Sequence, residues 1–202
     1  MAGDFDDDLF LRVNSFAQHS AWLHAPATAY AKYGILAFGV LLLVGWWISR
    51  SRADATMAAA LIAPLSGVLA VAINQPIVKR VAEARPYTLH PQALVLVTKS
   101  TDPSFPSDHA TMAGAVTVGL LLVSWRLGLV AAGFAVAMAL ARVYVGAHYP
   151  QDVVAGLALG ATVALVLWFV LRIPVTWVVR RLRDTSLRPL LASASQTADV
   201  LT

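Results

Sequence analysis

The chain has 202 residues, of which 58% are hydrophobic and 13% charged, and its mean hydropathy is +0.69. Soluble domains carry roughly 25% charged residues, so this composition excludes an ordinary water-soluble domain and a disordered chain, and the absence of cysteine excludes a secreted disulfide scaffold. The net charge of +4 would suit a nucleic-acid partner, but the basic residues gather at the ends of apolar runs, where they indicate membrane topology. We therefore expect one compact membrane domain and no nucleic-acid partner.

The N-terminal segment, residues 1–25, is too charged to cross a membrane. Its apolar side chains recur at helical intervals beside acidic ones: Phe5, Leu9, Val13, Phe16 and Leu23. This pattern predicts an amphipathic helix over about residues 4–22 that lies on the membrane surface. The segment lacks the basic start and apolar core of a cleavable signal peptide, so we expect it to remain in the mature chain.

Five apolar segments follow, at about 28–49, 55–78, 109–125, 127–146 and 151–172. About 20 mostly apolar residues are needed to cross the hydrocarbon core of a bilayer, and all five come close to that length. Lipid offers no partner for backbone polar groups and no segment alternates like a barrel strand, so these runs must be helical. The sequence predicts an all-α integral membrane bundle of about five transmembrane helices, within a domain that spans residues 26–173.

A basic C-terminal segment covers residues 174–202. Arginines surround apolar side chains up to Arg188, which predicts a basic interfacial helix against anionic lipid, with a partly disordered tail from about Leu191. Five crossings place this segment on the same side as Arg50, Arg52 and Arg126, and the positive-inside rule makes that side cytoplasmic. We expect a multi-pass protein with a cytoplasmic C-terminus. Lys32 and Arg126 are interpreted as side chains that reach lipid headgroups.

The long connection between the second and third apolar segments, residues 79–108, would lie on the extracytoplasmic side. Its prolines, among them Pro86 and Pro106, argue against one continuous helix but leave room for a short helix over residues 92–97.

Three polar clusters stand at segment ends on this side: residues 79–86, 103–110 and 142–152. Together they gather Lys, Arg, Ser, His and Asp at one membrane depth. Phosphoryl transfer needs cations on the nonbridging oxygens, a nucleophile in line with the leaving oxygen and a proton for that oxygen. The clusters offer a candidate for each requirement, which points to a phosphate ester as the ligand.

The binding candidates are Lys79, Arg85 and Arg142, whose cations would pair with phosphate oxygens. Ser107 and Asp108 complete the binding candidates. Ser107 precedes a helix expected to begin near Asp108, so the Ser107 hydroxyl and the free amides at this helix start would face an anion.

The catalytic candidates are His148, Asp152 and His109. His148 and Asp152 stand four residues apart around a helix start marked by Pro150, so the carboxylate can orient one imidazole nitrogen while the other attacks phosphorus. His109 then remains as the general acid. No cluster has metal-ligand spacing, and we expect no metal and no cofactor.

These residues resemble the three-part signature of the type 2 phosphatidic acid phosphatase superfamily, membrane lipid phosphatases that share their active site with vanadium haloperoxidases and glucose-6-phosphatase. The signature is Lys, six residues, Arg-Pro; Pro-Ser-Gly-His; and Ser-Arg, five residues, His, three residues, Asp. The resemblance covers roughly residues 5–175, and most positions match in type and spacing: Arg85, Pro86, Pro106, Ser107, His109, Arg142, His148 and Asp152. Three positions depart from the signature. Lys79 stands five residues from Arg85, Asp108 replaces Gly, and Ala141 replaces Ser.

The resemblance implies a metal-independent phosphatase. In this mechanism His148 forms a phosphohistidine that Asp152 supports, and His109 protonates the departing oxygen and later activates water. Residues 8–14, the Phe-Pro-Ser-Asp-His core and the short chain look most like the bacterial undecaprenyl-diphosphate phosphatases of the bacitracin-resistance type. That likeness implies hydrolysis of undecaprenyl diphosphate to undecaprenyl phosphate for cell wall biogenesis, at the extracytoplasmic face of the bacterial cytoplasmic membrane.

Three alternatives stay open on the sequence. Two are phosphatases of phosphatidylglycerol phosphate or phosphatidic acid, and the third is a transporter or lipid-binding membrane protein that holds an anion without cleaving it. Gly156 and Gly160 form a small-xxx-small step that would suit either a homodimer face or, as we favour, packing inside the bundle.

Overall fold

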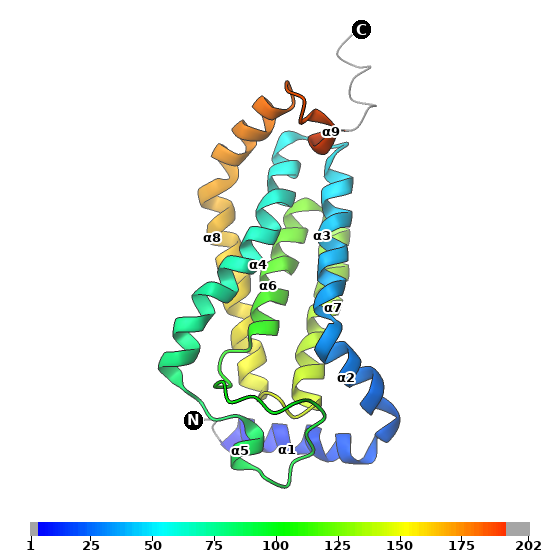
Figure 1. Ribbon diagram of the computed structural model, residues 1–202, viewed down its shortest axis with the longest axis vertical. Coiled ribbons are helices and arrows are strands. Elements are labelled where there is room, and N and C mark those ends of the chain that lie inside the picture. Colours follow the sequence, from blue (N-terminus) through cyan, green and yellow to red (C-terminus); the bar gives the residue numbers. More distant parts are fainter. Residues whose placement is uncertain (1–3, 193–202) are drawn as a thin grey trace.

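The computed structural model describes residues 4–192, which form helices and connecting loops with no β-strand in that range (Figure 1). Five helices run along an elongated bundle: α3 (Ile35–Ser49), α4 (Asp54–Val81), α6 (Asp108–Val123), α7 (Trp125–Tyr144) and α8 (Pro150–Leu182). One end of the bundle is crossed by α1 (Asp4–His19), and the other carries α9 (Arg188–Leu191). We name these the α1 end and the α9 end. The predicted all-α fold is confirmed.

Three helices, α4, α7 and α8, are long and apolar enough to cross a membrane by themselves. A fourth candidate span is bent, because α2 (His24–Tyr33) and α3 meet at an angle of 55° around Gly34, and the two are apolar and long enough only when taken together. The fifth predicted crossing, α6, is apolar but has only 16 residues. It packs against α4, α7 and α8, so protein rather than lipid covers much of its surface. The bundle thus matches the predicted segments, with one bent crossing and one short central helix.

The contact between α6 and α8 is close because α8 presents glycine to it. A Cβ atom on Gly160 would lie 1.9 Å from the carbonyl oxygen of Thr111, and one on Gly156 would lie 2.7 Å from that of Ser107. Only glycine allows two backbones to approach this closely. The favoured packing of both glycines inside the bundle is therefore confirmed. The approach also lets the Ser107 N–H donate to the Asp152 carbonyl oxygen at 3.0 Å, which joins the starts of the two helices.

The predicted N-terminal helix exists, and a face centred on three residues outside the predicted apolar stripe packs on the bundle. Phe10, Asn14 and Ala17 are buried against the α1 end of the bundle, whereas Phe5 and Phe16 of the predicted apolar stripe are exposed. Phe10 packs with Tyr149 and Val153 of the bundle, and Asn14 bonds to a loop, so tertiary partners select this face. The short helix η1 (Ala21–Leu23) then connects α1 to α2.

The connection between α4 and α6 contains one short helix, α5 (Pro86–Leu89), and is irregular afterwards. The prediction of a short helix over residues 92–97 is wrong, because these residues form an irregular loop. The Asn14 side chain donates to the Leu94 carbonyl oxygen at 2.8 Å and accepts from the Leu94 N–H at 2.9 Å, while the Leu96 N–H donates to the Val145 carbonyl oxygen at 3.0 Å. These long-range bonds replace the bonds that a helix would make along the segment.

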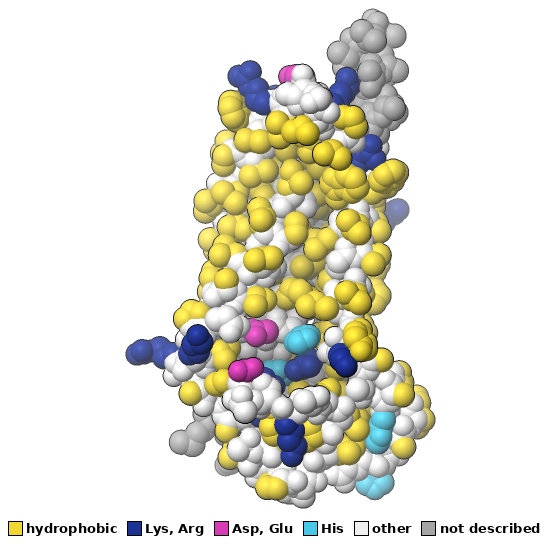
Figure 2. Space-filling view, in the orientation of Figure 1, with side chains coloured by type: hydrophobic (Ala, Val, Ile, Leu, Met, Phe, Trp, Pro, Cys, Tyr) yellow, Lys and Arg dark blue, Asp and Glu magenta, His cyan; other side chains and the backbone are white. Residues whose placement is uncertain are grey.

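At the α9 end, α8 continues without a break to Leu182, through the boundary expected near residue 173. Residues 174–182 of the predicted basic interfacial helix, with Arg180 and Arg181, form the last turns of α8, and Arg183 just beyond it pairs with Asp54 at 3.0 Å. The disordered tail predicted beyond Leu191 lies almost wholly outside the described residues. Apolar side chains cover the length of the bundle and charged ones gather toward its two ends, as expected of a membrane protein (Figure 2).

Candidate active site

A cavity of about 290 Å³ lies at the α1 end, where charged and His side chains gather at the edge of the apolar surface (Figure 2). Six of the eight predicted site residues line it: Lys79, Arg85, Asp108, His109, Arg142 and His148. The two imidazoles therefore share one cavity although they come from different elements. Gln75, Val78, Asp102, Pro103 and Pro106 complete the lining.

His148 stands in the turn between α7 and α8. The turn depends on Gly146, which has φ = +77° and lies so close to the neighbouring loop that a Cβ atom would be 2.5 Å from the Leu94 carbonyl oxygen. Glycine adopts this left-handed backbone conformation without strain, and it has no Cβ atom to collide with the neighbouring loop. The turn leaves His148 only 3% exposed, with its ring at the cavity wall.

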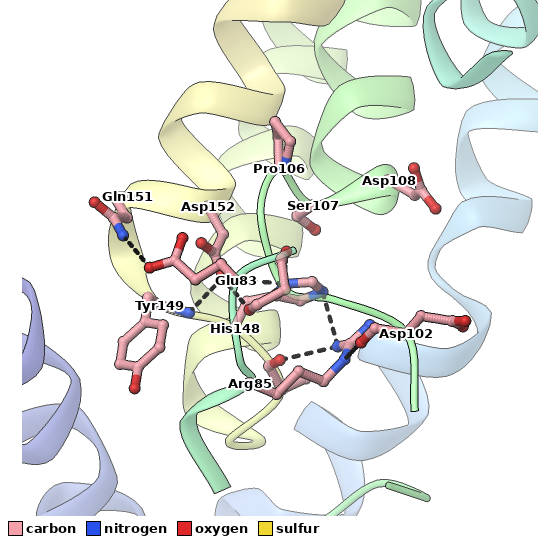
Figure 3. Close-up of polar contacts among 12 residues, drawn as sticks. Glu83, Arg85, Asp102, Pro106, Ser107, Asp108, His148, Tyr149, Gln151 and Asp152 are labelled. Atoms are coloured by element: carbon pink, nitrogen blue, oxygen red, sulfur yellow. Dashed lines mark hydrogen bonds and ion pairs between the residues drawn. The ribbon is translucent and has the colours of Figure 1, made fainter. Parts of the chain in front are cut away.

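The two ring nitrogens of His148 have opposite surroundings (Figure 3). Nδ1 lies 3.0 Å from the Ser104 carbonyl oxygen and 3.3 Å from Oδ2 of Asp152, and both of these are acceptors, so Nδ1 carries the proton. Nε2 lies 3.4 Å from Nη1 of Arg85, a donor, so it holds the lone pair. Burial lowers the pKa of His148 well below its usual value, and the positive charges of Arg142 and Arg85 lower it further. The ring is neutral at pH 7, with a bare nitrogen beside a cation.

Asp152 is fully buried in the first turn of α8 and lies behind the cavity wall. Its Oδ2 accepts hydrogen bonds from the Tyr149 N–H at 2.8 Å and from the Ser104 hydroxyl. Ser104 therefore contacts both members of the His148–Asp152 pair, one through its carbonyl oxygen and the other through its hydroxyl. Sequence reasoning did not select Ser104, because its partners stand 44 and 48 positions away.

The cations reach the cavity from three elements. Arg85, just before α5, donates from Nε to the Asp102 carbonyl oxygen at 2.7 Å and from Nη1 to the Ala147 carbonyl oxygen at 3.0 Å. Within residues 4–192 no hydrogen bond uses Nη2, so this nitrogen is left for a phosphate oxygen. Arg142, near the end of α7, donates to the Ala31 carbonyl oxygen at 3.4 Å, and its buried Nε has no partner within residues 4–192. Lys79 is exposed near the end of α4.

The motif residues at the start of α6 differ in their placement. Ser107 is fully buried, its hydroxyl makes no hydrogen bond to the described part of the chain, and it is not among the residues that line the cavity. Asp108 does line the cavity. Its Oδ1 accepts from the Asn74 amide at 2.7 Å and from the Gln75 amide at 2.9 Å, so α4 holds this carboxylate in place. Neither amide was selected from the sequence, although a polar residue inside an apolar span is itself a signal of a site.

A further set of polar contacts from α1 and the α4–α5 connection supports the start of α8. Oδ1 of Asp6 accepts from the Gln151 N–H at 2.9 Å, and the Gln151 amide donates to Glu83 at 3.0 Å. Burial raises the pKa of Asp6 and of Glu83. Asp6 therefore bonds the residue next to Asp152, a contact that the charged, solvent-facing pattern of α1 did not predict.

The arrangement can hold a multiply charged anion among Lys79, Arg85 and Arg142 and present to it a neutral, fixed imidazole nitrogen. A second imidazole, His109, faces the same space. Within residues 4–192, no three His, Asp or Glu side chains are grouped so that they could hold a metal ion.

Comparison with known proteins agrees with this chemistry. The PAP2 superfamily pattern matches residues 56–174. The chain is 28% identical to undecaprenyl-diphosphatase BcrC of Bacillus subtilis (strain 168) over 162 residues, and these residues make up 80% of each chain. It is 40% identical over 107 residues to a decaprenylphosphoryl-5-phosphoribose phosphatase of Mycobacterium tuberculosis, which is 52% of this chain and 58% of that protein.

The fold is also shared with a solved structure. A transmembrane PAP2-type phosphatidylglycerolphosphate phosphatase from Bacillus subtilis superposes with a TM-score of 0.61 at 20% identity, over 83% of this chain and 87% of that one. The matched residues 56–174 include every predicted site residue. The family match, the helical fold and the histidine-containing cavity agree with one another. The chain belongs to the PAP2 superfamily and is a membrane-embedded lipid phosphatase.

Proposed function

We propose that this phosphatase hydrolyses a prenyl diphosphate, converting undecaprenyl diphosphate to undecaprenyl phosphate through a phosphohistidine. One observation carries the proposal: Nδ1 of His148 faces acceptors from Ser104 and Asp152, and Nε2, which this arrangement leaves as the lone-pair nitrogen, stands at a cavity lined by three cations. A protein that only bound an anion would need the cations but not an oriented nucleophile. The name of the Bacillus subtilis relative supports undecaprenyl diphosphate as the substrate.

The reaction proceeds in two displacements. Nε2 of His148 attacks the terminal phosphorus, the bond from phosphorus to the bridging oxygen breaks, and the imidazolium form of His109 gives a proton to that oxygen and becomes neutral. Undecaprenyl phosphate leaves. His109 then takes a proton from water, whose oxygen attacks the phosphohistidine, and inorganic phosphate and free His148 result. Asp152 stabilises the charge that the His148 ring carries in the intermediate, while Arg85, Arg142 and Lys79 neutralise the transferring group.

We also propose that the α1 end faces the outside of the bacterial cytoplasmic membrane and the α9 end faces the cytoplasm. Arg50, Arg52, Arg126 and the arginines at the end of α8 all belong to the α9 end, which supports this orientation. The substrate's phosphates would then be cleaved at headgroup depth while its chain stays in the bilayer.

A panel of phosphate esters tests the substrate. The purified protein in detergent should release phosphate from undecaprenyl diphosphate with a kcat/KM at least about tenfold above those for phosphatidylglycerol phosphate, phosphatidic acid and a soluble aryl phosphate. A preference for either phospholipid would contradict the proposed substrate and leave the phosphatase activity standing.

Replacing the nucleophile separates turnover from binding. The His148→Ala variant should lose at least about a thousandfold in kcat and still bind the lipid phosphate, because the three cations remain. His19→Ala removes an exposed imidazole from α1 and should retain full activity. Undiminished phosphate release from His148→Ala would overturn the mechanism.

The pH dependence of kcat/KM tests whether the cations around His148 lower its pKa. Its pKa is lowered, so the ring loses its proton below the usual histidine pKa of about 6.5, and the acid limb of kcat/KM should lie below that pH. Arg85→Gln removes a positive charge that lowers this pKa, so the acid limb should move to higher pH. Arg80→Gln removes an exposed cation outside the cavity and should leave the limb in place.

The orientation can be measured by labelling, because the chain has no cysteine. A membrane-impermeant maleimide should label Thr101→Cys, exposed at the α1 end, in intact cells, and should label Ser186→Cys, exposed at the α9 end, only after lysis. The reverse pattern would place the site on the cytoplasmic face.

A further inference from the structure

A second cavity, of about 350 Å³, adjoins the first and shares two lining residues with it, His109 and Arg142. Its other walls come from Thr28, Ala31 and Lys32 of α2 and from residues 96–98 of the long connection. His148 lines only the first cavity. The proposed acid and one arginine therefore stand between the nucleophile's cavity and a neighbouring space of comparable size.

The two cavities differ in charge. The lining of the first includes two acidic residues, Asp102 and Asp108, beside its cations. The second has no carboxylate in its lining, and its permanent charges are those of Arg142 and Lys32. The Lys32 ammonium lies 5.1 Å from the centre of the Tyr33 ring and joins no ion pair within residues 4–192. The buried Nε of Arg142 likewise has no partner there. The second cavity thus favours an additional anionic group.

The chemistry of displacement indicates which anionic group this is. His148 attacks from within the first cavity, so the leaving oxygen departs on the opposite side of the phosphorus, toward the group that protonates it. That group, His109, borders the second cavity. We propose that the second cavity binds the leaving-group phosphate of a diphosphate ester, held by Lys32 and Arg142, and that this contact makes the enzyme prefer diphosphates to monophosphates. The inference rests on the proposed prenyl diphosphatase function and identifies a residue that sets its selectivity.

The path of the attached carbon chain agrees with this placement. An apolar groove of about 450 Å³ between α3, α4 and α6 is lined on α3 by Ile35, Phe38 and Gly39, which follow the bend at Gly34, whereas Thr28 and Lys32 of the second cavity precede it on α2. On α6, Met112 lines the groove three residues after His109. The groove and the second cavity are thus lined by residues only three positions apart in two places, Lys32 with Ile35 and His109 with Met112, which agrees with a carbon chain that leaves the second cavity toward the groove.

The test compares two lipids with the same chain, farnesyl diphosphate and farnesyl monophosphate, using purified protein in detergent. Lys32→Ala should raise KM for the diphosphate about tenfold and change KM for the monophosphate less than about twofold. Lys32→Arg, which keeps the cation, should restore most of the diphosphate KM. Lys99→Ala, which removes an exposed cation at the same end but outside both cavities, should behave like the wild type.

A binding measurement gives a second readout that does not need lipid turnover. Methylenediphosphonate should inhibit aryl phosphate hydrolysis by the wild type more strongly than methylphosphonate does, and Lys32→Ala should remove that difference. Equal KM changes for the two farnesyl esters, no change for either, or an unchanged inhibitor preference in Lys32→Ala would overturn the proposal. A wild-type protein that releases phosphate from neither ester would instead overturn the proposed function.

Discussion

The site depends on keeping one imidazole neutral and fixed at the end of a membrane-embedded bundle. His148 is buried, where a charged ring would be costly, and its Nδ1–H is bound on one side by a carbonyl oxygen and a carboxylate. The same burial that lowers its pKa leaves Nε2 bare toward the cations of the cavity. Ser104 is central to this arrangement because its carbonyl oxygen positions the ring and its hydroxyl bonds Asp152.

The bundle provides this arrangement by bringing backbones unusually close. Gly160 and Gly156 let α8 lie against α6, and the resulting contact between Ser107 and Asp152 joins the second and third polar clusters. Gly146 turns the chain so that His148 faces Ser104 instead of lipid. In a membrane, burying large apolar side chains between helices gains little, because lipid tails are equally apolar. Small residues stabilise the helix contacts instead, since they let the backbones approach closely.

Charge divides the space around the substrate. Asp108 places a carboxylate within a cationic cavity, and Asn74 and Gln75 hold it there. Repulsion from this carboxylate would direct the second phosphate of a diphosphate away from the first cavity, toward Lys32. Under this proposal, Asp108, which stands where the family signature has glycine, repels the second phosphate, and Lys32 on α2 attracts it. Both effects act on a diphosphate and neither acts on a monophosphate, which has no second phosphate.

The helical membrane fold could be predicted from the amino-acid sequence, because apolar runs in lipid must satisfy their own backbone polar groups, and so could the polar clusters that form the cavity. Four features could not be predicted in this way: the buried face of α1, the bend at Gly34, the irregular path of residues 90–107 and the contacts of Ser104, Asn74 and Gln75. Each of these depends on packing or on hydrogen bonds between positions far apart in the chain, such as the 34 between Asn74 and Asp108 or the 145 between Asp6 and Gln151. Local periodicity carries no information about such partners, since they meet only once the bundle has assembled.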